Sequence, residues 1–283
     1  MSRRQLLSVS VVGKDRTGVV AATTKFLFET GANIEALEEQ VTRGQFSMAI
    51  QASWSGSDWE PGPVREGLKR LAKELNMDIR SRQHTEGTAQ RFAIFVSKED
   101  HALIGLLDAV AKGRIKAEPV LVLSNHESLR PIAKAAQLPF RRIDWTQRRE
   151  AEGRALKLTE EFEVDFVVLA RFMKILSPQF VWYFKNKIIN IHPSLLPSFP
   201  GPQAYRQAYE HGVKIAGVTA HFVNMHLDEG PIIAQSSFEV KRGMTLKEIV
   251  QTGQGHETKT LVKAVKLYLS QRLDVHWGIV KEV

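Results

Sequence analysis

From residue 91 onward, short apolar runs rich in β-branched residues alternate with longer segments whose apolar residues recur at helical spacing. The strand-like runs are residues 91–96, 119–123, 165–169 and 188–191, and the helical segments between them are residues 102–111, 128–136 and 148–161. This alternation is typical of βαβ units, because each helix carries the chain back to begin a strand parallel to the previous one. We therefore predict an α/β domain over residues 91–283 with a mostly parallel sheet whose faces are covered by helices.

The end of this domain has a different pattern. Two more strand-like runs, residues 216–223 and 231–240, are followed by a helical pattern over residues 245–271. Because glycine is a poor helix former, we expect this last helix to break near Gly253 and Gly255.

The first 85 residues form a separate block. Strand-like runs occupy residues 6–12, 34–41, 46–54 and 77–82, and helical patterns occupy residues 19–29 and 64–75. The order βαββαβ predicts a small α+β sandwich. Residues 86–90 are polar and include a glycine, so we predict a linker there, between domains at residues 1–85 and 91–283.

Composition excludes several classes of protein. The chain is 43% hydrophobic and 25% charged, close to globular averages, and it has no cysteine, which excludes disulfides and zinc–thiolate sites and fits the cytoplasm. No apolar run approaches the roughly 18 residues of a membrane span, and we expect no signal peptide at the start. The net charge of +8 suits an anionic ligand, but the basic residues are scattered, so we do not expect a nucleic-acid partner.

Three polar residues form a candidate catalytic group. Asn190 and His192 lie two residues apart at the end of a predicted strand, so their side chains share one face, at the edge where α/β sheets bind ligands. Asp228 lies in a predicted turn between two strands. A carboxylate can orient an imidazole and stabilise its protonated form, and an amide can hydrogen-bond an oxyanion. The structural alternatives are a packed histidine, a capping asparagine and a turn aspartate.

A metal centre is not predicted. The remaining histidines form no His-x-His pair and no pair spaced by three residues, and cysteine is absent. We therefore expect neither a metal nor another cofactor.

Several motifs resemble the folate-dependent formyltransferase family. Residues 190–201, NIHPSLLPSFPG, resemble its signature, residues 169–177 its pterin-site loop, and residues 217–223 with 227–233 its aspartate loop. The resemblance implies a Rossmann-like domain, 10-formyltetrahydrofolate as substrate, no metal, and Asn190, His192 and Asp228 as the catalytic residues. It also implies a set of folate-binding residues: Arg171, Phe172, Met173, Lys174, Ile175, Leu176 and Gly230.

The N-terminal block resembles an ACT domain. Residues 13–18, GKDRTG, resemble the common D-R-P-G loop with Thr17 in place of proline, and residues 31–34 resemble the helix-to-strand turn. The resemblance implies a homo-oligomer, dimer or tetramer, and an amino-acid effector bound at Asp15, Arg16, Thr17 and Gly18. The structural alternative is that Asp15 only caps the helix and the domain only assembles the protein.

The formyl acceptor is the remaining question. An ACT domain before a formyltransferase-like domain resembles those family members that hydrolyse 10-formyltetrahydrofolate, supplying formate for one-carbon metabolism. Residues 96–102, VSKEDHA, have no glycine and two carboxylates, unlike the phosphate-binding loop of members that formylate glycinamide ribonucleotide. Ser97 and Asp100 also suit a helix cap. In contrast, Pro193 stands where hydrolysing members commonly carry a second histidine.

Three functions therefore stay open on the sequence. Hydrolysis is the first, and either His192 or Asp228 could activate the water. Transfer of the formyl group to an amine is the second. The third is a non-catalytic regulator that binds folate or an amino acid.

Overall fold

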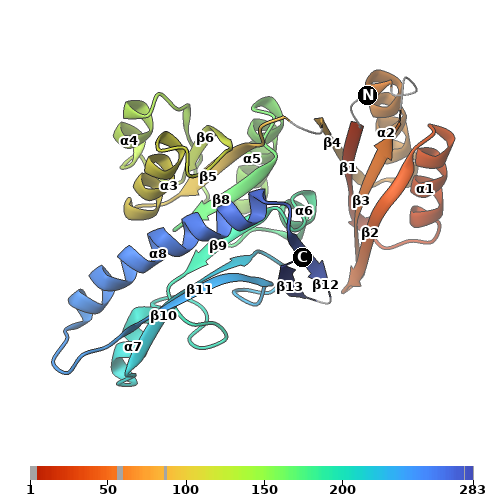
Figure 1. Cartoon of the computed structure of the whole chain (residues 1–283). Coiled ribbons are helices and arrows are strands. Elements are labelled where there is room, and N and C mark those ends of the chain that lie inside the picture. The colour runs from red at the N-terminus through yellow and green to blue at the C-terminus, as the bar shows by residue number, and fades with distance from the viewer. Residues whose placement is uncertain (1–4, 56–59, 86–87, 277, 283) are drawn as a thin grey trace. The chain divides into compact units, whose positions relative to one another are not determined.

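The computed structural model describes residues 5–55, 60–85, 88–276 and 278–282, and the chain divides into two compact units (Figure 1). The first unit comprises Met1–Thr88 together with Pro178–Lys185, and the second comprises Ala89–Ser177 and Asn186–Val283. The predicted linker, residues 86–90, lies beside this division, although residues 86 and 87 are outside the described part of the chain.

The first unit contains an antiparallel sheet with strand order β2-β3-β1-β4 and the two predicted helices. Its elements are β1 (Gln5–Lys14), α1 (Val19–Glu29), β2 (Asn33–Thr42), β3 (Gln45–Trp54), α2 (Pro61–Leu75) and β4 (Asp78–Thr85). Alternate residues of β1, such as Val9 and Val11, are buried in one apolar core with Leu68 and Leu71 of α2. The predicted βαββαβ sandwich is confirmed.

A short helix from much later in the chain completes the first unit. This helix, α6 (Pro178–Tyr183), contacts β1 and β3. The Arg80 guanidinium lies 5.9 Å from the centre of the Tyr183 ring, and the Arg82 guanidinium 5.4 Å from that of Phe184. The sequence does not predict α6, because six residues carry too little periodicity to indicate a helix.

The second unit contains a seven-stranded sheet with strand order β11-β10-β9-β8-β5-β6-β7. Strands β9, β8, β5, β6 and β7 are parallel, whereas β10 and β11 are antiparallel, so the mostly parallel sheet is confirmed. The elements up to the last parallel strand are β5 (Arg91–Val96), α3 (His101–Ala111), β6 (Glu118–Ser124), α4 (Arg130–Ala135), β7 (Phe140–Arg142), α5 (Arg148–Glu161), β8 (Phe166–Ala170) and β9 (Ile188–His192). The remaining elements are α7 (Ala204–Glu210), β10 (Ile215–Phe222), β11 (Ile232–Glu239), α8 (Leu246–Leu269) and the hairpin β12 (Leu273–His276) and β13 (Ile279–Glu282).

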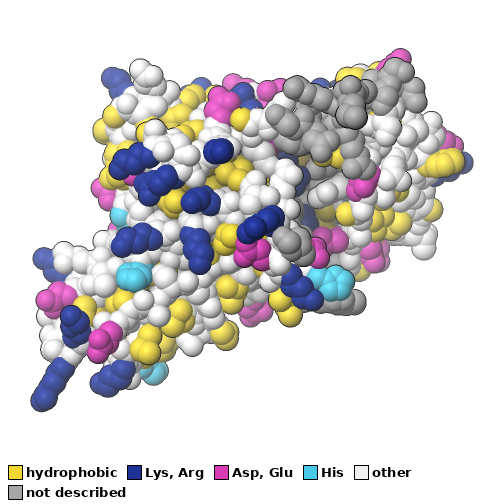
Figure 2. Space-filling model, viewed as in Figure 1, with side chains coloured by type: hydrophobic (Ala, Val, Ile, Leu, Met, Phe, Trp, Pro, Cys, Tyr) yellow, Lys and Arg dark blue, Asp and Glu magenta, His cyan; other side chains and the backbone are white. Residues whose placement is uncertain are grey.

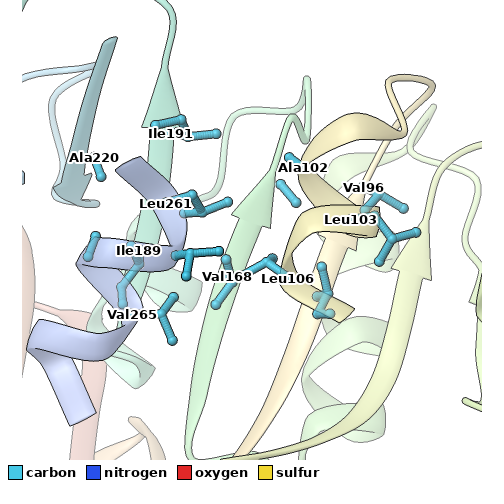
Figure 3. Close-up of a cluster of buried hydrophobic side chains, with 14 of the residues drawn as sticks. Val96, Ala102, Leu103, Leu106, Val168, Ile189, Ile191, Ala220, Leu261 and Val265 are labelled. Carbon is cyan, nitrogen blue, oxygen red and sulfur yellow. The ribbon is translucent and has the colours of Figure 1, made fainter. Parts of the chain in front are cut away.

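Two helices pack side by side on this sheet and form its main core. Figure 3 shows Leu103 and Leu106 of α3, and Leu261 and Val265 of α8, directed toward strands that include Ile189 of β9. All five side chains are fully buried. Close packing of this kind holds the ends of the strands rigidly, and the candidate site is built on those ends.

The expected break in the last helix is wrong, because α8 runs without interruption through Gly253 and Gly255. Thr245 begins it with a capping box to Glu248. A Cβ at position 253 would lie 2.1 Å from the Tyr205 hydroxyl, so the glycine serves a close contact between helices rather than a break.

Candidate active site

A cavity of about 560 Å³ opens where β8, β9 and β10 end, and α7 and the first half of α8 also line it. Residues 171–176, all predicted from the pterin-loop resemblance, lie on its wall, as do Asn190, His192 and Asp228. Three separate segments of the chain thus meet at one edge of the sheet, as expected for an α/β fold.

The predicted catalytic histidine and aspartate are in contact. The Nδ1 atom of His192 lies 3.3 Å from Oδ2 of Asp228, and both side chains are more than nine-tenths buried. The backbone N–H of Gly201 donates to the same carboxylate oxygen at 2.9 Å. Asp228 therefore connects the turn after β10 with the loop that follows β9.

The second nitrogen of His192 also faces an acceptor. Its Nε2 lies 3.0 Å from the carbonyl oxygen of Phe199. Since a carbonyl and a carboxylate can only accept, the arrangement is fully satisfied when both ring nitrogens of His192 carry hydrogen. A substrate oxygen must displace the Phe199 carbonyl to receive the Nε2 hydrogen.

Asn190 contacts His221, which lies within the motif at residues 217–223 but was given no role from the sequence. His221 lies opposite Asn190 in the β9–β10 ladder, and the Asn190 Nδ2 atom is 3.2 Å from its Nε2. The other ring nitrogen, Nδ1, is 2.8 Å from the Phe222 carbonyl oxygen. Burial lowers the pKa of His221 below its ordinary value, and the nearby His192 acts in the same direction. The pairing of β9 with β10 places His221 opposite Asn190, and the motif at residues 217–223 does not by itself indicate that pairing.

Gly230 does not lie on the cavity wall, in contrast to the other residues predicted to bind folate. It packs instead beneath β10, where a Cβ would lie 1.7 Å from the Phe222 carbonyl oxygen. The structure therefore gives Gly230 a packing role in holding the Asp228 turn against β10.

The loop after β8 has buried side chains near its two ends, Phe172 and Leu176, and exposed side chains between them. The Phe172 ring packs edge-on against Phe95 and Trp145, and the Met173 N–H donates to the Ser97 hydroxyl at 3.0 Å. Met173 and Ile175, in contrast, are 57% and 60% exposed. The loop is thus anchored by one set of side chains and offers apolar surface with the other.

The end of this loop is held by a buried carboxylate. The Ser177 N–H donates to Oε1 of Glu152 at 2.7 Å, and Glu152 is buried in α5. Burial raises the pKa of Glu152 above its ordinary value, although the hydrogen bond from Ser177 opposes this effect.

Replacing Glu152 by glutamine tests this anchor. In the native wild type, Glu152 holds its proton to a higher pH than it does in the unfolded chain. The free energy of unfolding therefore falls as the pH rises from the ordinary glutamate pKa of 4.5 through the raised pKa of the native state. Glutamine cannot titrate but still accepts the Ser177 hydrogen bond. We expect the variant to gain stability relative to wild type across that interval, by about 1.4 kcal/mol for each pH unit between the two pKa values, and then to keep this advantage at neutral pH.

Urea denaturation at several pH values measures this difference, with Glu150→Gln as the control that removes an exposed charge from the same helix. A Glu152→Gln variant that lost stability relative to wild type with rising pH would contradict the assignment.

A second group of polar residues gathers around Glu257, whose carboxylate lies on the cavity wall. The Glu257 carboxylate, fully buried in α8, accepts from the Tyr205 hydroxyl at 2.8 Å and lies 3.1 Å from Nε2 of His101. Nε of Arg171 is 3.5 Å from the same carboxylate. Burial and the Glu257 charge raise the pKa of Tyr205. These residues come from four segments, so no local sequence signal could join them.

Cationic side chains collect elsewhere on the second unit. Figure 2 shows Lys and Arg side chains over the region of α3 and α8. Between these helices, a cavity of about 470 Å³ is lined by five cationic residues, namely Arg114, Lys259, Lys263, Lys266 and Arg272. The three lysines share one face of α8 because they are spaced by four and three residues. Because these lysines are three and four residues apart, they do not form a continuous basic run in the sequence.

The described residues contain no group of three or more His, Cys, Asp or Glu side chains that could hold a metal ion. Within the same residues, no helix combines the length and the apolar character needed to cross a membrane.

Comparison with known proteins identifies the class of protein to which this chain belongs. Residues 90–265 match the formyl transferase family and residues 5–82 match the ACT domain. The chain thus belongs to the formyl transferase family and carries an ACT domain before it. More narrowly, it belongs to the formyltetrahydrofolate deformylases, and the resemblance in the sequence is confirmed.

The family assignment rests on similarity along nearly the whole chain. The chain is 38% identical over 267 residues to the formyltetrahydrofolate deformylase of Bacillus subtilis (strain 168), covering 93% of this chain and 88% of that protein. A crystal structure of a formyltetrahydrofolate deformylase from Pseudomonas syringae pv. tomato str. DC3000 matches with a TM-score of 0.68 at 29% identity, covering 98% of this chain and 94% of the other. Glycinamide ribonucleotide transformylase 1 from Symbiobacterium toebii has the same TM-score at 32% identity, but the match covers 71% of this chain and 97% of that one.

Proposed function

We propose that this chain hydrolyses 10-formyltetrahydrofolate to formate and tetrahydrofolate. The observation that carries the proposal is the convergence of Asn190, His192 and Asp228 on one wall of the cavity. Together they supply an amide, an imidazole and a carboxylate, which are the groups that acyl transfer to water requires.

The proposed reaction has two stages. Water forms a bond to the formyl carbon and gives a proton to the Asp228 carboxylate, and the carbonyl oxygen becomes an oxyanion. Protonated His192 and the Asn190 amide stabilise that oxyanion. The carbon–nitrogen bond then breaks as His192 protonates the leaving folate nitrogen, and the proton held by Asp228 passes to His192 and restores its charge. Oδ2 of Asp228 is engaged by His192 and Gly201, so we assign the other oxygen, Oδ1, to positioning the water.

The surroundings of the cavity favour water over a phosphate-bearing acceptor. The segment after β5 places the Glu99 carboxylate on the cavity wall, where Gln254 donates to it at 3.0 Å. The Glu257 carboxylate lies on the same wall and holds His101 from that segment. A phosphate binding there would face carboxylates, which repel it.

The exposed cation on the cavity wall, Lys174, and the cations near it suit an anionic substrate. Lys174 is exposed on the wall, and the positive charges of Lys98, Lys174 and Arg142 all act on His126. Burial in the first place, and these charges in addition, lower the pKa of His126. The carboxylates of the folate glutamate would be attracted to this group of cations.

A formate-release assay tests the proposal. We expect formate from 10-formyltetrahydrofolate at the same rate with and without glycinamide ribonucleotide. A formylated amine as the main product would favour the transferase alternative, and folate binding without turnover would favour the regulator.

We infer further that the first unit assembles the protein and binds an amino acid, within a cytoplasmic enzyme. Strand β2 is an edge strand exposed along nearly its whole length, and such edges tend to pair with a second copy. At the start of α1, Gly18 is the N-cap with φ 87°, and no side chain caps the helix. Asp15 therefore does not cap α1 as the structural alternative supposed, and the first-turn N–H groups could receive a carboxylate.

Sedimentation tests the assembly. Leu37→Lys with Val41→Lys on β2 should shift the particle toward monomer, whereas Val20→Lys on α1 should not; an unchanged oligomer would contradict the role of β2. For the effector, we expect at least one amino acid to raise the melting temperature and to change the rate of formate release. If none raises the melting temperature, the binding proposal is wrong.

A further inference from the structure

We propose that His221, held as a neutral imidazole with its hydrogen on Nδ1, is a positioning residue that fixes the amide orientation of Asn190. This inference rests on the proposed function, since it assigns a role within that active site. Neither the family motifs nor the comparisons assign a role to His221.

The hydrogen-bond partners of His221 determine its tautomer. Nδ1 lies 2.8 Å from the Phe222 carbonyl oxygen, which can only accept, so Nδ1 must carry a hydrogen. The ring is 2% exposed, and burial disfavours the charged form. Nε2 is therefore a bare acceptor.

A bare Nε2 selects one of the two orientations of the Asn190 amide. At 3.2 Å, Asn190 can satisfy that nitrogen only through Nδ2–H, because its Oδ1 would place two acceptors against each other. One hydrogen of the amide group is then used by His221. The second remains available to a substrate oxygen in the cavity that Asn190 lines.

The charges around His221 agree with this arrangement. Oδ1 of Asp228 is 3.9 Å from Nε2 of His221, beyond hydrogen-bond distance, while Oδ2 faces His192 at 3.3 Å. Of the two histidines beside Asp228, His192 thus receives the direct contact. If His221 were protonated at Nε2, its N–H would oppose that of Asn190 and turn the amide away from its working orientation.

The backbone around His221 holds the tautomer in place. The Phe222 N–H donates to the Pro231 carbonyl at 2.8 Å, and Gly230 packs directly against the Phe222 carbonyl group. The Phe222 carbonyl, which sets the Nδ1 hydrogen, is therefore held from both sides.

A double-mutant cycle on formate release tests the role. We expect His221→Phe to lower kcat by about 10–10²-fold with little change in KM, a loss no larger than that of removing the amide itself by Asn190→Ala. In the Asn190→Ala background, the same substitution should change kcat by less than about 2-fold, because its effect passes through Asn190. His221→Gln, which retains an acceptor, should recover part of the activity. The control is His256→Phe, whose imidazole contacts the Ser236 hydroxyl, and it should leave kcat unchanged.

Nitrogen NMR of the histidine-labelled protein provides a readout that does not depend on activity. Comparison with the His221→Phe variant assigns the signals, and we expect Nδ1 protonated and Nε2 unprotonated at neutral pH. A hydrogen on Nε2, or equal losses from His221→Phe in both backgrounds, would overturn the proposal. If the wild type released no formate but the NMR showed the expected tautomer, the proposed function would fail and the tautomer assignment would stand.

Discussion

Replacing Asp228 by asparagine is expected to reduce formate release by about 10²–10⁴-fold while the fold stays intact. Asparagine tolerates the left-handed backbone of Asp228, whose φ is 57°, and its amide oxygen can still accept from the Gly201 N–H. What it lacks is the negative charge that stabilises protonated His192. The loss should therefore appear in kcat more than in the melting temperature.

His192→Ala should cause a loss of the same order, since it removes the imidazole that the carboxylate orients. Circular dichroism and the melting temperature of both variants separate a catalytic loss from unfolding. Near wild-type formate release by either variant would show that the proposed catalytic group is wrong.

Replacing Gly230 by alanine is expected to damage both stability and activity. The new Cβ would lie 1.7 Å from the Phe222 carbonyl oxygen and 2.8 Å from its carbon, and both are backbone atoms that cannot rotate away. The turn carrying Asp228 must shift, and overpacking of this kind costs about 1–3 kcal/mol or more. We expect the melting temperature to fall by roughly 2–4 °C per kcal/mol, and formate release to fall along with it.

Gly255→Ala is the matched control for this prediction. Gly255 lies inside α8, and a Cβ there meets nothing within 4 Å. Alanine at that position should stabilise the helix by up to about 1 kcal/mol and leave formate release unchanged. A Gly230→Ala variant that behaved like Gly255→Ala would contradict the packing described for the Asp228 turn.

Local patterns were sufficient for most of the secondary structure. The bounds of α1 and α5 agree with the prediction to the residue because each has a long run at the helical period. The bounds of β5 also agree, because it is a short and almost wholly apolar run. The predicted break in α8 failed because the sequence cannot show that Tyr205 packs against Gly253. Short elements such as α6 and β7 were not predicted, since three to six residues do not establish a period.

The sequence likewise predicted some residues of the candidate site and missed others. Asn190 and His192 could be predicted because they lie two residues apart on one strand, and Asp228 because its turn follows a recognisable motif. Gly230 belongs to the same motif, yet the structure gives it a packing position instead of a place on the cavity wall. His221 was passed over because its role depends on facing Asn190 across the β9–β10 ladder.

The sequence by itself determined the order of the longer strands and helices, the two kinds of fold, and the residue types that can carry acyl transfer, because periodicity and short motifs are local properties. Only the tertiary structure decided which distant groups meet: His101 with Glu257, His192 with Asp228, and α6 with the first unit. Such contacts depend on strand register and helix packing, which bring together residues from distant segments through buried area and hydrogen bonding rather than through any pattern along the chain.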